Sequence, residues 1–331
     1  MKEIDLLANY ISLDKTPKSW INCIDVVKDN YRNDWLEKYD FNKILNYYGL
    51  DDKFKKRLFI ELDNLKCDEK LNLICFIMYY ILFKTSLKDY NDIWDWKSTK
   101  DTFKNHGSFM IPVIALLCGY EYHVKNMQER GYDKEQIVIQ KYNIRNICLN
   151  DRKLHNIDGI RFSQMIWGSF FMKGNLIQIG RLQYENDDNP LKIKKYINGN
   201  CNFVYIHIPK GENLNEEDVI DSFSNVDKYI RKYYKESLDK KIVYYIESWL
   251  LSPELKEILP NSSNIIKFQN KFNIVEYEEN IEDFLNFVFD DVLDNIKYDE
   301  LPENTSLQKA LKKKILNKEK LHLGLGILKK E

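Results

Sequence analysis

The spacing of apolar residues changes once along this chain, near Asn175, and that change limits the folds available to it. Before Asn175, aromatic and aliphatic residues recur every three or four positions, which is the period of an amphipathic helix. After it, several runs alternate at every second position, which is the period of a β-strand. We therefore predict an α+β protein, in which a helical N-terminal domain precedes a mixed sheet flanked by helices.

The predicted helices cover most of the chain before Asn175. They are expected at Trp35–Tyr48, Phe54–Leu65, Leu71–Phe83, Phe109–Cys118, Lys134–Leu149 and Ile157–Phe170. The runs Leu71–Phe83 and Phe109–Cys118 are apolar nearly all round, but they fall short of the roughly 20 residues that span a membrane. We interpret both as core helices. The domain boundary is placed between residues 1–131, all helical, and residues 132–331.

The remainder of the chain alternates between strand and helix patterns. Strands are expected at Asn175–Glu185, Asn202–Ile208, Lys241–Glu247 and Phe272–Tyr277, and helices at Asn215–Tyr234 and Ile281–Val292. This alternation predicts a mixed sheet with helices on its faces. The stretch Leu323–Gly326 contains two glycines, but no helix pattern follows it. We therefore interpret it as a closing turn or edge strand rather than a phosphate loop.

Composition and spacing exclude several classes of protein. The 50 basic and 51 acidic residues give a formal net charge of −1, which argues against a nucleic-acid partner. The start Met1–Asp5 carries acids where a secretory signal needs basic residues. Neither the six cysteines nor the five histidines have metal-ligand spacing. We expect a cytoplasmic protein with no membrane or metal site; its oligomeric state cannot be read from the sequence.

Polar side chains within the predicted strands are the candidate site residues. His207 shares one face of its strand with Phe203 and Tyr205, and Glu185 follows Arg181 and Gln183 on a face of the first strand. Ser248 stands where a later strand ends, a place that ligands favour. The alternative is structural: a buried, hydrogen-bonded histidine and a solvated sheet face.

Six short motifs occur in an order that resembles a family of bacterial acyltransferase-domain proteins. Members of that family join an N-acyltransferase N-terminal domain to a GNAT-like C-terminal domain. The motifs are Gly159–Phe162 with Trp167, Ile179–Glu185, His207–Gly211, Ser248–Pro253, Ser263–Ile265 with Phe268, and Leu301–Pro302 with Thr305–Gln308. By motif the resemblance covers roughly residues 135 to 328, and by general character it covers the helical N-terminus.

The resemblance implies an N-acyltransferase that moves an acyl group directly from an acyl-CoA-type thioester, acetyl-CoA or longer, to a small-molecule amine. Two neighbouring parallel strands would splay apart to admit the pantetheine arm. Here they would be Phe203–Ile208 and Ile242–Glu247, joined by the Asn215–Tyr234 helix. Contacts to the CoA would come from Ile208, Pro209, Lys210 and Gly211.

Acid–base chemistry assigns roles to three residues under this resemblance. An amine arrives mostly protonated, and a histidine, with an ordinary pKa near 6.5, needs less tuning as a base than a carboxylate near 4. We predict that His207 is the base or a proton relay. Glu185 would be its partner or bind the acceptor's ammonium group. Ser248 would donate a hydrogen bond to the thioester or to the leaving thiolate.

The sequence departs from the usual GNAT pattern where the pyrophosphate would bind. Ile208–Asn215 replaces the glycine-rich loop, and Glu216, Glu217 and Asp218 add negative charge at the start of the helix. Three explanations stay open: the CoA lies differently, the donor is not CoA, or the protein does not transfer an acyl group. The second functional hypothesis is therefore a non-catalytic ligand-binding or regulatory protein on a GNAT-like scaffold. The third is a helical partner-binding protein without a small-molecule site.

Overall fold

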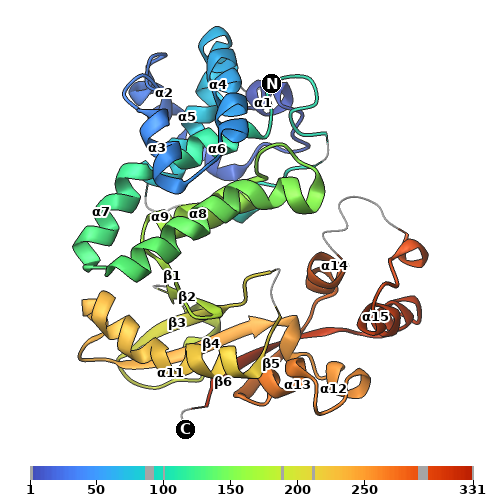
Figure 1. Ribbon diagram of the computed structural model, residues 1–331. Coiled ribbons are helices and arrows are strands. Elements are labelled where there is room, and N and C mark those ends of the chain that lie inside the picture. The colour runs from blue at the N-terminus through green and yellow to red at the C-terminus, as the bar shows by residue number, and fades with distance from the viewer. Residues whose placement is uncertain are drawn as a thin grey trace. The chain divides into compact units, whose positions relative to one another are not determined.

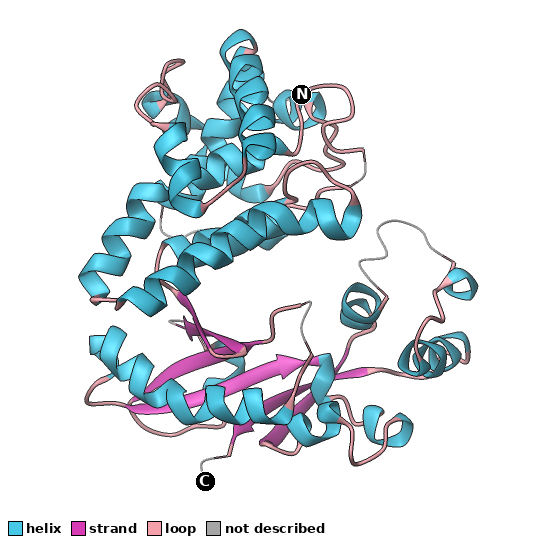
Figure 2. Cartoon of the chain, viewed as in Figure 1, coloured by secondary structure: helices cyan, strands magenta, loops and turns pink. Residues whose placement is uncertain are grey.

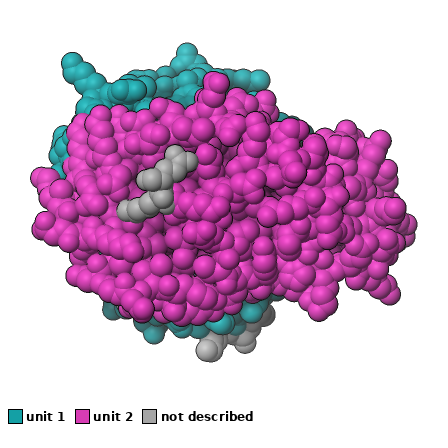
Figure 3. Space-filling view, turned by 90° about the horizontal axis from the view of Figure 1, so that it is seen from below, with its two compact units in different colours: residues 1–175 teal, residues 176–331 magenta. Residues whose placement is uncertain are grey.

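The computed structural model describes residues 3–85, 93–99, 101–187, 190–210, 213–289 and 297–329. The chain divides into two compact units, Met1–Asn175 and Leu176–Glu331 (Figure 3).

Every regular element in the described part of the first unit is a helix (Figure 2), as the apolar period predicts. Aspartates begin several of these helices: Asp51, Asp68 and Asp133 each accept a hydrogen bond from the backbone N–H three residues later, at 2.7, 3.0 and 2.9 Å. The helices are α1 (Glu3–Tyr10), α2 (Lys18–Asn30), α3 (Phe41–Tyr48), α4 (Asp52–Cys67), α5 (Glu69–Lys84), η2 (Ile93–Asp95), α6 (Met110–Leu117), α7 (Tyr120–Arg130), α8 (Lys134–His155) and α9 (Phe162–Met172).

Helices α5 and α6 form the centre of this unit, as predicted for the two apolar runs. All eight residues of α6 are buried, and α5 is buried on most of its circumference from Leu71 to Phe83. The two helices pack against each other, and α9 packs against both. No helix in the described ranges is both long enough and apolar enough to cross a bilayer.

The boundary between the compact units lies at residues 175/176, whereas the sequence placed a domain boundary at 131/132. The difference comes from α8 and α9, which pack within the first unit: α8 on α3 and α9, and α9 on α6 and α7. Gly168 allows part of this packing, because a Cβ there would lie 2.7 Å from the Leu116 side chain. Helical period reveals that a segment is helical but not which neighbours it packs against.

The second unit is built on a six-stranded mixed sheet in the order β1-β2-β3-β4-β6-β5 (Figure 1). Strands β3 and β4 are parallel, and every other neighbouring pair is antiparallel. The predicted α+β class, helical region first and flanked sheet second, is confirmed. The strands are β1 (Leu176–Ile179), β2 (Leu182–Asp187), β3 (Cys201–His207), β4 (Lys241–Ser248), β5 (Phe272–Glu279) and β6 (His322–Leu328).

The stretch Asn175–Glu185, predicted as one strand, is instead a hairpin. Strands β1 and β2 pair through Ile179↔Leu182, with Gly180 and Arg181 as the two turn residues. Gly180 has φ of 59°, a conformation that favours glycine and suits a two-residue hairpin turn. Arg181 therefore lies in the turn and not on the sheet face with Gln183 and Glu185.

Helix α11 (Glu216–Tyr233) connects β3 to β4 and lies along one face of the sheet (Figure 1). A parallel pair needs such a crossover. The buried stripe of α11 includes Val219, Val226 and Ile230. Ser222 fixes its first half to the hairpin, because its hydroxyl donates to the Ile179 carbonyl and lies 2.8 Å from the Tyr184 hydroxyl.

The other helices of this unit are short. Helix α10 lies in the polar stretch between β2 and β3, and its Ile193 packs against Phe203 and Tyr245 on the face opposite α11. Helices α14 and α15 enclose a second apolar cluster with the start of β6. These elements are α10 (Leu191–Lys194), η3 (Lys235–Ser237), η4 (Trp249–Leu251), α12 (Leu255–Ile258), α13 (Asn264–Gln269), α14 (Glu282–Val288), η5 (Tyr298–Glu300) and α15 (Ser306–Leu316).

Strand β6 contains Leu323–Gly326, and it is an interior strand instead of the expected turn or edge. It pairs with β4 on one side and with β5 on the other. Its glycines permit close packing, since a Cβ on Gly324 would lie 2.8 Å from the backbone oxygen of Leu251. A residue with a side chain could not occupy that position without displacing η4.

Candidate functional site

The two parallel strands separate at their C-terminal ends, which creates a notch in the sheet. Pairing between β3 and β4 runs from Cys201↔Lys241 to Tyr205↔Tyr245 and stops there. Strand β3 continues to His207 paired only with β2, and β4 continues to Ser248 paired only with β6. The backbone groups that face the notch are therefore available to something other than a neighbouring strand.

Tyr205 spans this notch in the structure. Its hydroxyl donates to the carbonyl of Glu247 at 2.9 Å and accepts from the N–H of the same residue at 3.2 Å. One phenol thus satisfies both backbone groups that β4 presents just beyond the last paired residue. Burial, followed by the charge of Glu247, raises the pKa of Tyr205 above its ordinary range, so the phenol stays protonated.

Glu185 and His207 lie together on the sheet face that carries Tyr205. The Glu185 Oε2 and His207 Nε2 atoms are 2.8 Å apart, and both side chains are only partly exposed, at 25% and 20%. In the register of β2 and β3, Glu185 is opposite Tyr205 and Gln183 is opposite His207. The pair is thus a diagonal one, within reach of long side chains. The Tyr205 and His207 rings are 4.4 Å apart.

Further ionisable groups surround the pair on the same face. Tyr245 bonds to Asp187 of β2, and Lys192 of α10 donates at 2.7 Å to both Glu247 and Glu278. Burial alone would lower the pKa of Lys192, but these two bonds outweigh it and raise that pKa. A lysine so held fixes the Glu247 carboxylate beside the notch.

Ser248 is placed differently from Glu185 and His207. Strand alternation turns its side chain to the face shared by Tyr244, whose hydroxyl bonds to Asp227 of α11 at 3.2 Å. The Ser248 Oγ accepts from the N–H of Leu250 at 3.1 Å and so begins η4. Ser248 therefore marks the end of β4 at the notch but does not meet the other two predicted residues.

The predicted CoA loop is described from Ile208 to Lys210; Gly211 lies outside the described residues. Arg181 holds this loop from the hairpin turn. Its guanidinium donates to the carbonyls of Pro209 at 2.9 Å and Asn213 at 3.0 Å. Pro209 and Asn213 are thus both held by a cation that is itself buried.

The acidic start of α11 is partly neutralised. Lys267 of α13 contacts Glu216 at 2.8 Å, and this bond lowers the pKa of the Glu216 carboxyl. The Asn215 amide donates to Asp218 at 3.1 Å. Sequence reasoning counted these acids without their partners, because Lys267 follows Glu216 at a distance that no local pattern joins.

Three residues of this site were not among the sequence candidates: Tyr205, Arg181 and Lys192. Tyr205 could have been found, because it lies between Phe203 and His207 on the face already chosen. Arg181 was noticed but placed on a strand. Lys192 gave no signal, since it belongs to a polar stretch with no clear period.

Among the described residues, no group of histidine, cysteine, aspartate and glutamate side chains is arranged to hold a metal ion.

Comparisons with known proteins agree with this architecture. A family model described as GNAT-like C-terminal domain matches residues 176–328, which is the second unit almost from end to end. No curated protein matches the chain. The second unit is therefore a GNAT-like domain that follows a helical unit.

Several solved structures share the fold over nearly the whole chain. One is an acyltransferase in complex with decanoyl-CoA and teicoplanin, 15% identical, with a TM-score of 0.69 and 99% of each chain covered. Another is an acyltransferase in complex with CoA and 10C-teicoplanin, 16% identical, with the same TM-score and coverage. A third is an acyltransferase mutant in complex with octanoyl-CoA, 15% identical, with a TM-score of 0.69 and both chains covered completely. At these identities the likeness concerns the fold.

Proposed function

We propose that this protein is an N-acyltransferase that moves an acyl group from an acyl-CoA thioester directly to an amine. The notch between β3 and β4 carries the proposal, because two parallel strands stop pairing where each still continues. An extended pantetheine arm has amide groups that can bond to the backbone left unpaired there. Solved structures with this fold contain decanoyl-CoA and octanoyl-CoA, which supports a CoA thioester as the donor.

In the proposed reaction the amine nitrogen attacks the thioester carbonyl carbon. A C–N bond forms, the C–S bond breaks, and CoA leaves as a thiolate that takes up a proton. His207 would accept the proton that the ammonium must lose, while Glu185 at 2.8 Å holds the imidazole in place. No covalent enzyme intermediate is needed, because holding the two reactants together supplies much of the rate.

The remaining predicted residues complete this proposal. Ile208, Pro209, Lys210 and Gly211 would border the pyrophosphate near the start of α11, where helix N–H groups favour an anion. Ser248, at the end of β4, would donate a hydrogen bond to the thioester or to the leaving thiolate, while its oxygen accepts from the Leu250 N–H. A CoA donor places the reaction in the cytoplasm. The acceptor is a small amine, to be identified by testing a panel of amines.

The test is release of free CoA from acetyl-, octanoyl- and decanoyl-CoA in the presence of an amine panel. We expect His207→Gln to lower kcat by about 10²- to 10⁴-fold, the range for loss of a general base, with donor affinity unchanged. Glu185→Gln should lower kcat less, because the base itself remains.

His322→Gln is the matched control, because His322 forms a similar pair with Glu254, with Nδ1 and Oε1 2.6 Å apart. His322 belongs to β6, on the side of β4 that does not face β3. Unchanged turnover in both His207→Gln and Glu185→Gln would contradict the assigned roles. Donor binding by calorimetry without any release of CoA would favour a ligand-binding protein, and no heat with millimolar acyl-CoA would overturn the proposal.

A further inference from the structure

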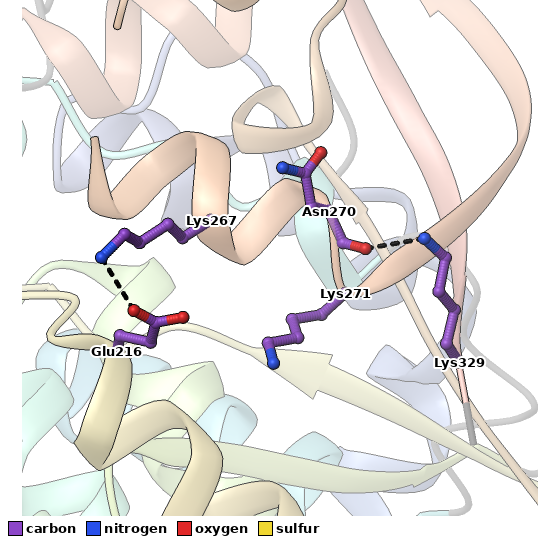
Figure 4. Close-up of a pocket in the computed structure, with 5 residues that line it drawn as sticks. All are labelled: Glu216, Lys267, Asn270, Lys271 and Lys329. Carbon is purple, nitrogen blue, oxygen red and sulfur yellow. Dashed lines mark hydrogen bonds and ion pairs between the residues drawn. The ribbon is translucent and has the colours of Figure 1, made fainter. Parts of the chain in front are cut away.

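A small, lysine-rich pocket lies beside the start of α11, the helix that follows β3 in the chain. It has a volume of about 300 Å³ and is lined by Glu216, Lys267, Asn270, Lys271 and Lys329 (Figure 4). We propose that this pocket binds the 3′-phosphate of the CoA donor, an assignment that rests on the proposed function.

The three lysines reach the pocket from separate parts of the chain. Lys267 is on α13, Lys271 precedes β5, and Lys329 follows β6. Hydrogen bonds to the backbone hold Lys329 beside Lys271, because the Lys329 N–H donates to the Lys271 carbonyl at 3.0 Å and the Lys329 ammonium donates to the Asn270 carbonyl at 2.7 Å. The positions of Lys271 and Lys329 at the pocket are therefore fixed by the fold and do not depend on flexible side chains alone.

Helix α13 is also fixed to α11, which forms the other wall. Phe223 of α11 stacks on Phe268 with ring centroids 6.2 Å apart and meets Phe272 edge to face at 6.0 Å. These aromatic contacts set the distance between the start of α11 and the lysines. The pocket is thus a feature of one packed cluster within the second unit.

The charge of the pocket matches a phosphate monoester. The lining has three lysine ammonium groups and the single carboxylate of Glu216, so its formal charge is +2; Lys267 pairs with that carboxylate at 2.8 Å. A phosphate monoester carries about −1.5 to −2 near neutral pH. The positive end of the 18-residue helix α11 adds to this attraction.

The position also suits the chemistry of CoA. The thioester would occupy the notch and the pyrophosphate the loop that ends at α11, so the ribose 3′-phosphate would lie beyond that loop. A phosphopantetheine arm carried on a protein has no 3′-phosphate. The pocket would therefore select free acyl-CoA over an acyl group borne by a carrier protein.

The experiment compares the affinities of the full-length protein for CoA and for 3′-dephospho-CoA by calorimetry. We expect the wild type to prefer CoA by roughly tenfold or more. Lys271→Gln and Lys329→Gln should each reduce that preference about three- to tenfold, the fold-change for one partly exposed charge-assisted contact. Lys313→Gln, an equal change of charge on exposed α15, should leave it unchanged.

Binding of adenosine 3′,5′-bisphosphate and of adenosine 5′-monophosphate separates this proposal from the proposed function, since neither has a thioester. One result would be that the wild type binds the bisphosphate more tightly than the monophosphate and that Lys271→Gln abolishes that preference. This result would support the 3′-phosphate assignment even if no acyl transfer were found. Acyl transfer together with equal affinity for CoA and 3′-dephospho-CoA would overturn the 3′-phosphate assignment. The proposed transferase function would still stand. Equal weakening of both CoA forms by Lys271→Gln would also overturn the 3′-phosphate assignment.

Discussion

Tyr205 illustrates how a single residue can stand in for a ligand. Its hydroxyl is both donor and acceptor, and so is a peptide unit such as the amide of a pantetheine arm. In the structure it satisfies the N–H and the carbonyl of Glu247, the first groups of β4 beyond its pairing with β3. If the donor uses those groups, the phenol must give them up.

Tyr205→Phe should therefore separate the two states of the site. Without the hydroxyl, two partly buried backbone groups lose their partner in the free protein, which costs about 1 kcal/mol or somewhat more. The donor would supply the missing bonds. We expect a lower free energy of unfolding for the free protein and an affinity for acyl-CoA that rises about three- to tenfold, measured by urea unfolding and calorimetry.

Tyr244→Phe is the control for this effect. It removes a tyrosine hydroxyl from the neighbouring strand β4, and that hydroxyl bonds to Asp227 on the opposite face of the sheet. It should lower stability without changing donor affinity. A loss of affinity in Tyr205→Phe would show that the phenol supports donor binding and does not compete with it.

Contacts between single side chains could be predicted from the sequence only where the two-residue alternation of a strand determines them. Glu185 and His207 were expected on adjacent parts of one sheet, and in the structure their side chains are 2.8 Å apart. The bond from Tyr205 to Glu247 depends on two strands separating, which no apolar period records. Ser248 fell on the other face because one position along a strand reverses the side chain.

Among the elements, strand β6 depends most on its glycines. Gly324 is paired with Ser248 of β4 and Tyr277 of β5, and a Cβ there would lie 2.6 Å from the Cβ and 2.8 Å from the backbone oxygen of Leu251. We expect Gly324→Ala to lower the free energy of unfolding by about 1–3 kcal/mol, because η4 must move to admit the methyl group. Urea unfolding measures the change.

Gly326→Ala supplies the comparison on the same strand. Its nearest neighbour would be the Cδ1 atom of Leu251 at 2.6 Å, the tip of a side chain that can rotate away. The loss should be smaller than for Gly324→Ala. A larger loss at Gly326 would mean that η4 yields more easily than the structure indicates.

Elements with a clear period were found from the sequence, and those broken by glycine were misplaced. The crossover α11 and both parallel strands were predicted close to where they lie. Gly180 divides an apparently continuous strand into a hairpin, because a positive φ reverses the chain without interrupting the apolar alternation. Gly324 and Gly326 made an interior strand look like a turn.

For the molecule as a whole, one buried histidine makes stability depend on pH. His123 lies in the helical unit with its Nδ1 atom 2.8 Å from the Tyr48 hydroxyl, and burial, with a smaller effect of Lys141, lowers its pKa from 6.5 to about 3. Between pH 6.5 and about 3, His123 therefore binds a proton in the unfolded chain but stays neutral in the folded chain. Stability from this group is complete above pH 6.5 and decreases as the pH falls toward 3.

Comparison with His123→Gln isolates this contribution from other titrating groups. Between pH 7.5 and 5 the wild type should lose about 2 kcal/mol more than the variant, which is 1.36 kcal/mol for each of about 1.5 pH units below 6.5. Urea unfolding at each pH gives the difference. Parallel losses in the two proteins would mean that His123 becomes protonated without unfolding.

At the scale of the whole chain, the division into compact units and the predicted domain boundary lie at different places. The change of period near Asn175 coincides with the end of the first compact unit, yet the domain boundary was placed at a glycine, Gly131, that ends α7. A helix that ends in a left-handed glycine marks only a local stop. Packing of α8 and α9 on earlier helices decides the unit to which they belong.

The place of β6 also sets the order in which the sheet can be completed during synthesis. β6 lies between β4 and β5 but follows both in the sequence. Ribosomes add about 5–20 residues per second, so β4 waits on the order of ten seconds for its second neighbour. During that interval it presents a row of unpaired N–H and carbonyl groups, the kind of edge that recruits strands from other chains. The nascent protein is thus most exposed to mispairing, and most in need of a chaperone, until residues 322–328 emerge.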